Sequence, residues 1–288
     1  MVQVVLENGC MKVRGEMLRG QLILDCGQAF RYTQQKDGSY FGVAGQRAIY
    51  MRDDGEGIEV YPVCRQEEQE FWENYLDLHL DYTQILAKMA EKDQILAKAS
   101  REFPGIRLLN QQPFETLISF IISANNHIPR IKGILERLCT LAGERKNLEG
   151  REYFAFPAPE RLAALREEDL RAIGAGYRAP YLLQTARRIC DGFSLDALRA
   201  LSYGEAKAAL CTLPGVGPKV ADCVLLFSLG KKEAFPADTW IHKVIERLYG
   251  VTCTTARQSE AFARRQFGAY GGIAQQYLFH YARMHRLT

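Results

Sequence analysis

The sequence has no apolar run near the roughly 20 residues that a membrane-spanning helix needs, and its first residues lack the basic-then-apolar pattern of an export signal. Its eight cysteines are scattered and form no CxxC pair, which argues against a structural zinc site and an iron–sulfur cluster. We therefore expect reduced thiols and no membrane partner. The expected location is the cytoplasm (the nucleoid of a bacterium or archaeon), or the nucleus if the chain is eukaryotic.

The 288 residues suffice for one large domain or two ordinary ones, with a sizeable core. Charge is unevenly distributed along them. Residues 1–100 hold 11 Lys and Arg against 16 Asp and Glu, a net charge of −5, whereas residues 101–288 hold 26 against 18, a net charge of +8. The second part is therefore suited to an anionic partner such as nucleic acid, although the asymmetry alone is weak evidence.

Hydrophobic periodicity changes once along the chain. Short stretches rich in aromatic and β-branched residues, separated by turn residues, predict strands at 27–35, 39–46, 47–53 and 57–63. From residue 66 onward apolar residues recur at spacings of three and four, which is typical of amphipathic helices. The order predicts an α+β chain, with an N-terminal antiparallel β-sheet domain and trailing helices in 1–100 and a helical domain in 101–288.

One turn, LPGVGP at residues 213–218, lies between two helical patterns. Gly215 and Gly217 permit positive φ and a close approach of the backbone to a partner, and Pro218 suits the first position of the next helix. A helix start can hold a phosphate. This pattern is typical of a helix-hairpin-helix motif that binds the DNA backbone independently of sequence. The alternative is a plain helical hairpin with glycine caps.

Two chemically suggestive side chains follow this turn. Lys219 lies in the first helical turn, where the helix dipole disfavours a cation and so favours the neutral amine that a Schiff-base nucleophile requires. Asp238 precedes another helical pattern and suits an N-cap, which leaves one carboxylate oxygen free to face a developing cation. For Lys219, the alternative is a phosphate-binding or exposed lysine. For Asp238, the alternative is a simple helix cap. Asp222, three residues after Lys219, is the competing carboxylate, but we expect it on the surface or in an ion pair.

Several stretches together carry a family resemblance: GQAFRY, FIISANNHIPRIKGILERLC, IGAGYRAPY, LPGVGPKVADC, FPADTW and GIAQQYLF. With these, nearly the whole chain resembles the helix-hairpin-helix DNA glycosylases with a Gly/Pro-rich loop followed by an aspartate, and among them the 8-oxoguanine DNA glycosylases. In that family the hairpin lysine attacks the sugar and the later aspartate is also required; Lys219 and Asp238 match those positions. The 3-methyladenine branch has no such lysine, and the endonuclease III and adenine glycosylase branch usually carries a four-cysteine cluster, absent here.

The resemblance also implies a base-binding pocket. Gln275 and Phe279 are four residues apart and share a helix face, where an amide can pair with the Watson–Crick edge of a flipped purine and an aromatic ring can stack on it. Cys223 would contact the other side of the base, and the Gly27 carbonyl would accept the N7–H of 8-oxoguanine. The alternative for the pair is a core aromatic beside a solvated amide.

Four more residues match those that fill the gap opposite the flipped base, wedge the stack and donate to cytosine: Asn125, Arg130, Tyr177 and Arg178. Having both arginines favours cytosine opposite the lesion, since arginine is a good donor to a base edge. The alternative for either arginine is a phosphate contact or a surface charge.

The chain departs from the family at two positions. Trp240 stands where better-known eukaryotic members carry a phosphate-contacting histidine, so that His242 is the nearest substitute, and His127 replaces an asparagine. These departures concern individual contacts to the DNA backbone and leave the implied chemistry unchanged.

The family's hairpin carbonyls, here those of Cys211, Leu213 and Val216, are expected to hold a Na⁺ or K⁺ ion, for which the sequence itself gives no ligand signature. No other cofactor is required. The resemblance implies a bifunctional DNA glycosylase and abasic-site lyase, acting as a monomer on double-stranded DNA that contains 8-oxoguanine. Two alternatives stay open: a glycosylase for formamidopyrimidine or an oxidised pyrimidine, and a non-catalytic helix-hairpin-helix DNA-binding protein, which would not need Lys219 and Asp238 together.

Overall fold

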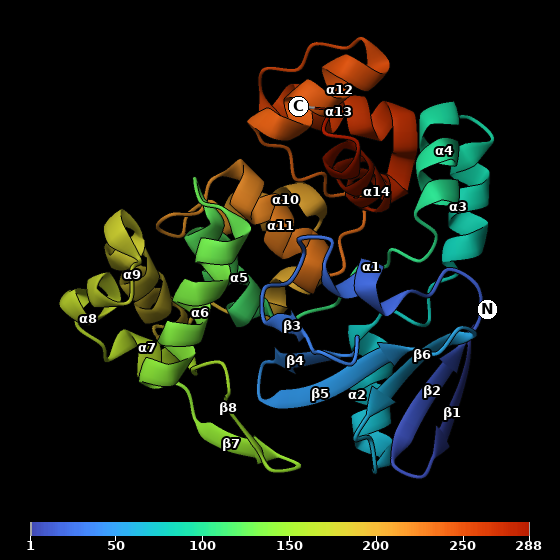
Figure 1. The fold of residues 1–288 in the computed structure, drawn as a ribbon. Helices are drawn as coiled ribbons and strands as arrows, with labels where there is room; N and C mark the ends of the chain where they lie inside the picture. Colours follow the sequence, from blue (N-terminus) through green and yellow to red (C-terminus); the bar gives the residue numbers. More distant parts are fainter. Residues whose placement is uncertain (1, 288) are drawn as a thin grey trace.

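The computed structural model describes residues 2–287 and begins with a six-stranded antiparallel sheet, in which the strands follow the order β1-β2-β6-β5-β4-β3 (Figure 1). The strands are β1 (Gln3–Glu7), β2 (Cys10–Arg14), β3 (Tyr32–Gln34), β4 (Tyr40–Ala44), β5 (Arg47–Asp53) and β6 (Gly57–Tyr61). The α+β class and the N-terminal sheet predicted from the sequence are confirmed.

Two details of the sheet differ from the predicted strands. The hairpin β1–β2 was not among them, although its turn residues Asn8 and Gly9 both have positive φ, as an Asn-Gly hairpin turn requires. The strand predicted from residue 27 begins only at Tyr32. The preceding residues form a loop between α1 (Gly20–Leu24) and β3, because their polar groups bond to segments outside the sheet.

The rest of the chain is mostly helical. Its helices are α2 (Gln66–Tyr75), α3 (Tyr82–Ala90), α4 (Gln94–Glu102), α5 (Pro113–Ser123), α6 (Ile128–Ala142), α7 (Pro159–Ala163), α8 (Glu167–Ala172), α9 (Ala179–Cys190), α10 (Tyr203–Leu210), α11 (Pro218–Ser228), α12 (Thr239–Tyr249), α13 (Ala256–Phe267) and α14 (Gly271–Met284). None of the helices within residues 2–287 is both long and apolar enough to cross a bilayer.

Two helices form the centre of the helical part. Residues 115–122 of α5 and 220–228 of α11 are all buried, and the two helices pack against each other. A helix that is apolar on all sides is stable only when other elements surround it, which explains why these two lie innermost. Their stacked rings, Phe120 and Phe227, have centroids 5.5 Å apart.

A second hairpin interrupts the helical part and contacts the sheet. It consists of β7 (Arg145–Leu148) and β8 (Arg151–Phe154), which the sequence patterns did not predict. The Arg151 guanidinium lies 3.8 Å from the centroid of the Phe41 ring on β4, and the Phe156 N–H donates to the Gly45 carbonyl at 2.8 Å. The hairpin and the segment that follows it thereby attach the helical part to β4 and to the turn between β4 and β5.

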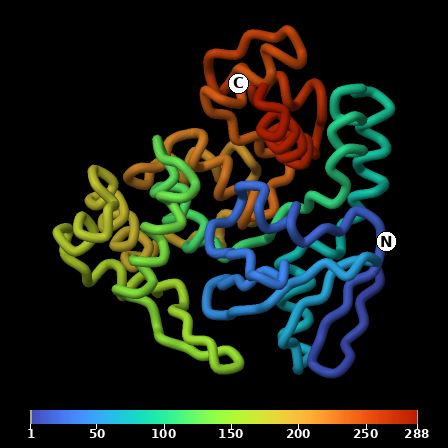
Figure 2. The backbone as a smooth tube through the Cα atoms, in the orientation of Figure 1, coloured from blue at the N-terminus to red at the C-terminus, as the bar shows by residue number. Residues whose placement is uncertain are grey.

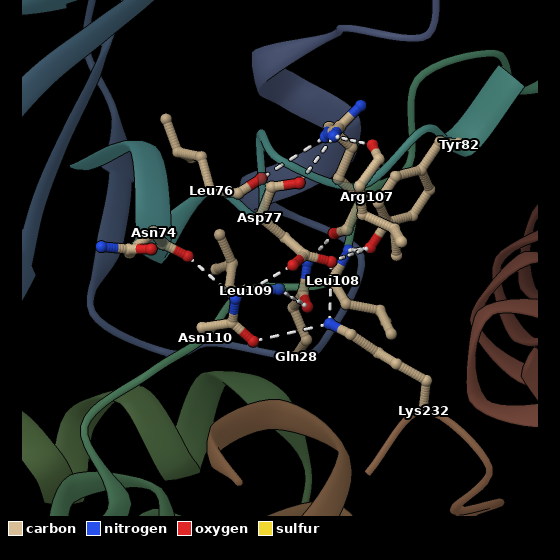
Figure 3. A network of polar contacts seen from close by, with 11 residues as sticks. Gln28, Asn74, Leu76, Asp77, Tyr82, Arg107, Leu108, Leu109, Asn110 and Lys232 are labelled. Carbon is tan, nitrogen blue, oxygen red and sulfur yellow. Dashed lines mark hydrogen bonds and ion pairs between the residues drawn. The ribbon is translucent and has the colours of Figure 1, made fainter. Parts of the chain in front are cut away.

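The boundary predicted at residue 100 between the sheet domain and the helical domain stays a prediction. Buried side chains of α3 and α4 belong to the helical core, whereas those of α2 belong to the core under the sheet. The segment after α4 is fixed by Arg107, whose guanidinium donates to the carbonyls of Leu76, Asp77 and Leu80 at 2.7–3.4 Å (Figure 3).

Arg107→Met is expected to lower the free energy of unfolding by about 3 kcal/mol, because it leaves buried carbonyls without donors. Urea denaturation measures the loss, with the exposed Arg101→Met as the control, for which we expect no change. Equal midpoints for both variants would contradict the structural role of Arg107.

Candidate active site

A cavity of about 150 Å³ lies where the loop before β3 meets α5, α11, the start of α12 and α14. Figure 2 shows this loop (blue) rising from the sheet toward the C-terminal helices (orange and red). The cavity is lined by both residues predicted to be catalytic and all four predicted to bind the base: Lys219, Asp238, Gly27, Cys223, Gln275 and Phe279.

Lys219 is half-buried in the first turn of α11, directly after the turn Gly217-Pro218. Its Nζ lies 5.1 Å from the centroid of the Phe120 ring. Cys223, one turn further along the helix, is buried, and burial raises its pKa to about 12, while the nearby Lys219 acts in the opposite direction. The thiol is therefore neutral at pH 7 and offers an apolar, uncharged wall to the cavity.

Asp238 is the N-cap of α12. Its Oδ1 accepts hydrogen bonds from the backbone N–H groups of Trp240 at 3.1 Å and Ile241 at 3.0 Å. Its Oδ2 accepts none from the described residues, and no ion pair within 4 Å joins it to Lys219 in that part of the chain. Capping therefore fixes the carboxylate at one oxygen and leaves the other available to the cavity.

Asp222, the competing carboxylate, does not line the cavity. It is buried and accepts hydrogen bonds from Lys207 at 2.9 Å and Tyr203 at 2.7 Å. The pKa of Asp222 is raised to about 6 by burial, and the Lys207 amine opposes that shift. The side chain thus has an ion-pair role between α10 and α11, as expected, although it is buried rather than at the surface.

Gln275 and Phe279 lie on the same face of α14, and both border the cavity. Gln275 is only 5% exposed, and its buried Oε1 has no hydrogen-bond partner among residues 2–287. Buried acceptors in native proteins almost always have a donor. The amide oxygen of Gln275 can therefore accept a hydrogen bond from an N–H group that enters the cavity.

Gly27 lies beside Phe279 at the wall of the cavity. Its φ of +87° suits glycine, and a Cβ there would lie 3.3 Å from Phe279 Cε1. The ring of Trp240 packs edge-on against Phe279, with centroids 4.8 Å apart. Trp240, one of the residues at which the chain departs from the family pattern, thus contacts the pocket wall through its aromatic ring. The Nε2 of His242, the nearest substitute for the family's histidine, is buried and has no partner in the part of the chain that the structure describes.

The residues predicted to contact the opposite strand gather at one place, around the turn after α5 and the 3₁₀ turn Gly176–Arg178. Asn125 and Arg130 are exposed, and Tyr177 is 53% exposed with its hydroxyl 3.3 Å from the Ala124 carbonyl. Arg178 differs because it is only 3% exposed and donates to the carbonyls of Ala124 and Asn125. In this structure it supports the turn that presents Asn125, and donation to a base would require it to leave those carbonyls.

The two hairpin glycines differ in their surroundings. Gly215 has a φ of +77°, and a Cβ there would lie 2.8 Å from the Tyr181 side chain, so the fold itself requires this glycine. Gly217 has a φ of −91°, and a Cβ there would meet no atom of the described residues within 4 Å. Glycine at 217 is therefore not required by the fold, which favours a close approach by something outside the protein.

The hairpin carbonyls are compatible with a cation. The Leu213 carbonyl accepts from the Val216 N–H at 3.1 Å and keeps a second lone pair, and none of the loop hydrogen bonds between described residues uses the carbonyls of Cys211 or Val216. Backbone oxygens are ligands that hard cations accept. Within residues 2–287 no group of three or more His, Cys, Asp or Glu side chains could hold a metal ion.

Sequence reasoning missed three polar residues that line the cavity: Ser123, Asn126 and the more deeply buried Gln276. Gln276 is 3% exposed, and its Nε2 donates to the Cys26 carbonyl at 2.7 Å. Consecutive helical residues point about 100° apart, so only one of the two adjacent glutamines was expected to face a pocket. The partner lies 250 residues earlier in the chain, which no local pattern reveals.

Comparisons with known proteins agree along the whole chain. Residues 11–117 match the family described as 8-oxoguanine DNA glycosylase, N-terminal domain, and residues 118–267 match that of the HhH-GPD superfamily base excision DNA repair proteins. The chain is 33% identical over 276 residues to the N-glycosylase/DNA lyase OGG1 of Arabidopsis thaliana, covering 90% of this chain and 75% of that protein. It is 31% identical over 258 residues to a probable N-glycosylase/DNA lyase of Methanothermobacter thermautotrophicus, covering 82% of each.

Two solved structures are similar over nearly the full length. One is MBOgg1 in complex with a low-affinity DNA ligand, with a TM-score of 0.94, 36% identity and 99% of both chains covered. The other is the Clostridium acetobutylicum 8-oxoguanine glycosylase/lyase in complex with double-stranded DNA containing cytosine opposite 8-oxoG, with a TM-score of 0.93, 38% identity, and 99% of this chain and 98% of that chain covered.

The cap geometry predicts different effects for two changes at Asp238. Asp238→Ala removes both cap hydrogen bonds and is expected to lower the free energy of unfolding by about 1 kcal/mol, whereas Asp238→Asn keeps an oxygen in the cap position and is expected to change it by a few tenths. Urea denaturation of both variants checks this. Equal losses would mean that the carboxylate oxygen does not cap α12.

Proposed function

The chain belongs to the 8-oxoguanine DNA glycosylases of the HhH-GPD superfamily, and from that premise we propose that it excises 8-oxoguanine from duplex DNA as an N-glycosylase and DNA lyase, with Lys219 as nucleophile. One observation carries the assignment of residues. A single cavity is bordered by the Lys219 amine, the Asp238 carboxylate and the unpartnered amide oxygen of Gln275. A non-catalytic DNA-binding protein would have no need of this combination.

In the proposed chemistry, the nitrogen lone pair of the Lys219 amine attacks C1′ of the deoxyribose, and the bond between C1′ and the base nitrogen breaks with its electron pair leaving on the base. Asp238 stabilises the positive charge that develops on the sugar and helps to transfer protons. The free Oδ2 of Asp238 supports this role, because the cap fixes the carboxylate without using that oxygen. The nitrogen now bonded to C1′ loses a proton and the C1′–O4′ bond breaks, which opens the sugar and leaves a Schiff base. Loss of a C2′ proton then breaks the C3′–O bond by β-elimination, so that the strand is cut 3′ to the abasic site.

Recognition of the base is assigned to the other walls of the cavity. Gln275 Oε1 would accept an N–H of the Watson–Crick edge, and the flipped base would lie between Phe279 and the neutral Cys223 thiol. Gly27 would accept the N7–H, which 8-oxoguanine has and guanine lacks. Flipping costs a few kcal/mol, which contacts to the pocket and the backbone offset.

The opposite base is proposed to be cytosine, contacted from the surface around Asn125, Arg130 and Tyr177. The exposed Arg130 is the available donor in the free protein, whereas Arg178 would first exchange its carbonyl partners for the base. Tyr177 is exposed enough to serve as the wedge.

We propose further that the protein acts as a monomer in the cytoplasm or nucleus and that the chemistry requires no cofactor. A Na⁺ or K⁺ ion held by the carbonyls of Cys211, Leu213 and Val216 would serve to fix the hairpin backbone against DNA. No step of the reaction is assigned to it.

Lys219→Gln is expected to abolish the covalent complex that borohydride traps between the protein and a duplex containing 8-oxoguanine opposite cytosine, because an amide cannot form a Schiff base. Denaturing gels measure the cross-link. The matched control is the exposed Lys243→Gln on α12, which is expected to cross-link normally. A cross-link that survives Lys219→Gln would assign the nucleophile to another residue. Parallel duplexes with formamidopyrimidine or an oxidised pyrimidine test the alternative lesions.

Gly217→Val is expected to weaken binding to an undamaged duplex about tenfold, since the side chain would hold the hairpin backbone away from a phosphate. The melting temperature should stay nearly unchanged, because a Cβ at this position meets nothing. Gly215→Val is the comparison and should lower the melting temperature by several degrees. Unchanged DNA affinity for Gly217→Val would argue against backbone contact at this turn.

A further inference from the structure

The loop that carries Gly27 is held by glutamine side chains on both sides of that residue. The carbonyl of Cys26, immediately before it, accepts from Gln276 Nε2 at 2.7 Å. The carbonyl of Gln28, immediately after it, accepts from Gln111 Nε2, also at 2.7 Å. All three glutamines are buried, so neither bond is exposed to competition by bulk water.

Hydrogen bonds of its own side chain hold Gln28 in place. Its Nε2 donates to the Arg107 carbonyl at 2.7 Å, and its Oε1 accepts from the Leu109 N–H at 2.8 Å (Figure 3). The same Nε2 also donates to the Ile23 carbonyl at 2.8 Å. Arg107 in turn is bound to the carbonyls after α2. The residue following Gly27 is therefore held by a network that extends to two other segments of the chain.

The carbonyl of Gly27 differs from the two flanking carbonyls in its hydrogen bonding. It accepts none of the hydrogen bonds between residues 2 and 287, although both flanking carbonyls do, and Gly27 borders the cavity. Glycine has more backbone freedom than any other residue, so its carbonyl would point in many directions if the neighbouring peptide groups were not held. Fixing the peptide groups on either side restricts the two dihedral angles that set that direction.

We propose that Gln276, together with Gln111 and Gln28, positions the Gly27 carbonyl and thereby sets the discrimination between 8-oxoguanine and guanine. The inference rests on the proposed function and deepens it. Guanine presents an N7 lone pair where 8-oxoguanine presents an N–H, so a fixed carbonyl attracts one base and repels the other. Hydrogen bonds weaken steeply when misaligned, and a carbonyl free to turn away would lose both the attraction and the repulsion.

Gln276→Met tests the positioning role, because methionine has a similar length and no donor. We expect single-turnover release of 8-oxoguanine from a duplex with cytosine opposite the lesion to fall about tenfold, the size of one hydrogen bond. In a Lys219→Gln background, the ratio of the affinities for lesion and guanine duplexes should also fall about tenfold. Borohydride trapping on a duplex with a preformed abasic site should stay within about twofold, since no base has to be recognised.

The matched control is Gln266→Met, which removes a hydrogen bond to Asp93 Oδ2 at 2.8 Å on α13, outside the cavity, and is expected to change none of the three readouts. Gln111→Met reaches the same loop from the other side and should reproduce the selectivity loss. If the Gln276 variant does not fold, the Gln111 variant decides the question.

An equal fall in base release and abasic-site trapping would show a merely structural role and overturn the inference, as would an unchanged affinity ratio. Failure of the unaltered protein to release 8-oxoguanine would overturn the proposed function and the inference with it. A failure confined to the glutamine variants would overturn the inference alone.

Discussion

The hydrogen bonds of the buried Gln28 side chain hold the loop before β3 against the rest of the chain, and the geometry of the pocket depends on that attachment. They join the loop to residues 23, 107 and 109, while Gln276 joins it to α14. The cavity is thus assembled from the sheet domain and from helices that lie far apart in the sequence. A buried amide whose hydrogen bonds are all formed favours one arrangement of the loop, because each bond lost would leave a polar group unpaired in the interior.

The pocket combines two neutral groups, the Cys223 thiol and the Gln275 amide, with the two groups proposed to be catalytic. Cys223 is kept protonated by burial, and Gln275 offers an amide oxygen without a partner. Lys219 and Asp238 are not joined by an ion pair within 4 Å in the described part of the chain, so neither group is committed to the other before a substrate enters. The helix caps place both groups: Gly217 and Pro218 start α11 just before the amine, and Asp238 starts α12. Capping therefore supplies preorganisation as well as stability.

Local patterns predict the features that local physics determines. The change from strands to amphipathic helices, the glycine turn before Lys219 and the cap at Asp238 all follow from propensity and capping chemistry. The Asn8-Gly9 hairpin could have been found by the same rules. The loop at residues 27–31 could not, since its composition suits a strand and only bonds to residues about 80 and 250 positions away hold it out of the sheet. The burial of Arg178 and the hydrogen bond from Gln276 to the Cys26 carbonyl cannot be predicted from one sequence either. Both depend on which distant segments of the chain pack together.

The central claim is that one amine, that of Lys219, reaches the sugar carbon in a cavity built for an oxidised purine. Mass spectrometry of the borohydride-trapped complex after nuclease and trypsin digestion tests this most directly. A sugar on Lys219 blocks cleavage there, so the account predicts that the added mass lies on a peptide spanning residues 208–231. The same mass on a peptide that excludes Lys219 would contradict the account.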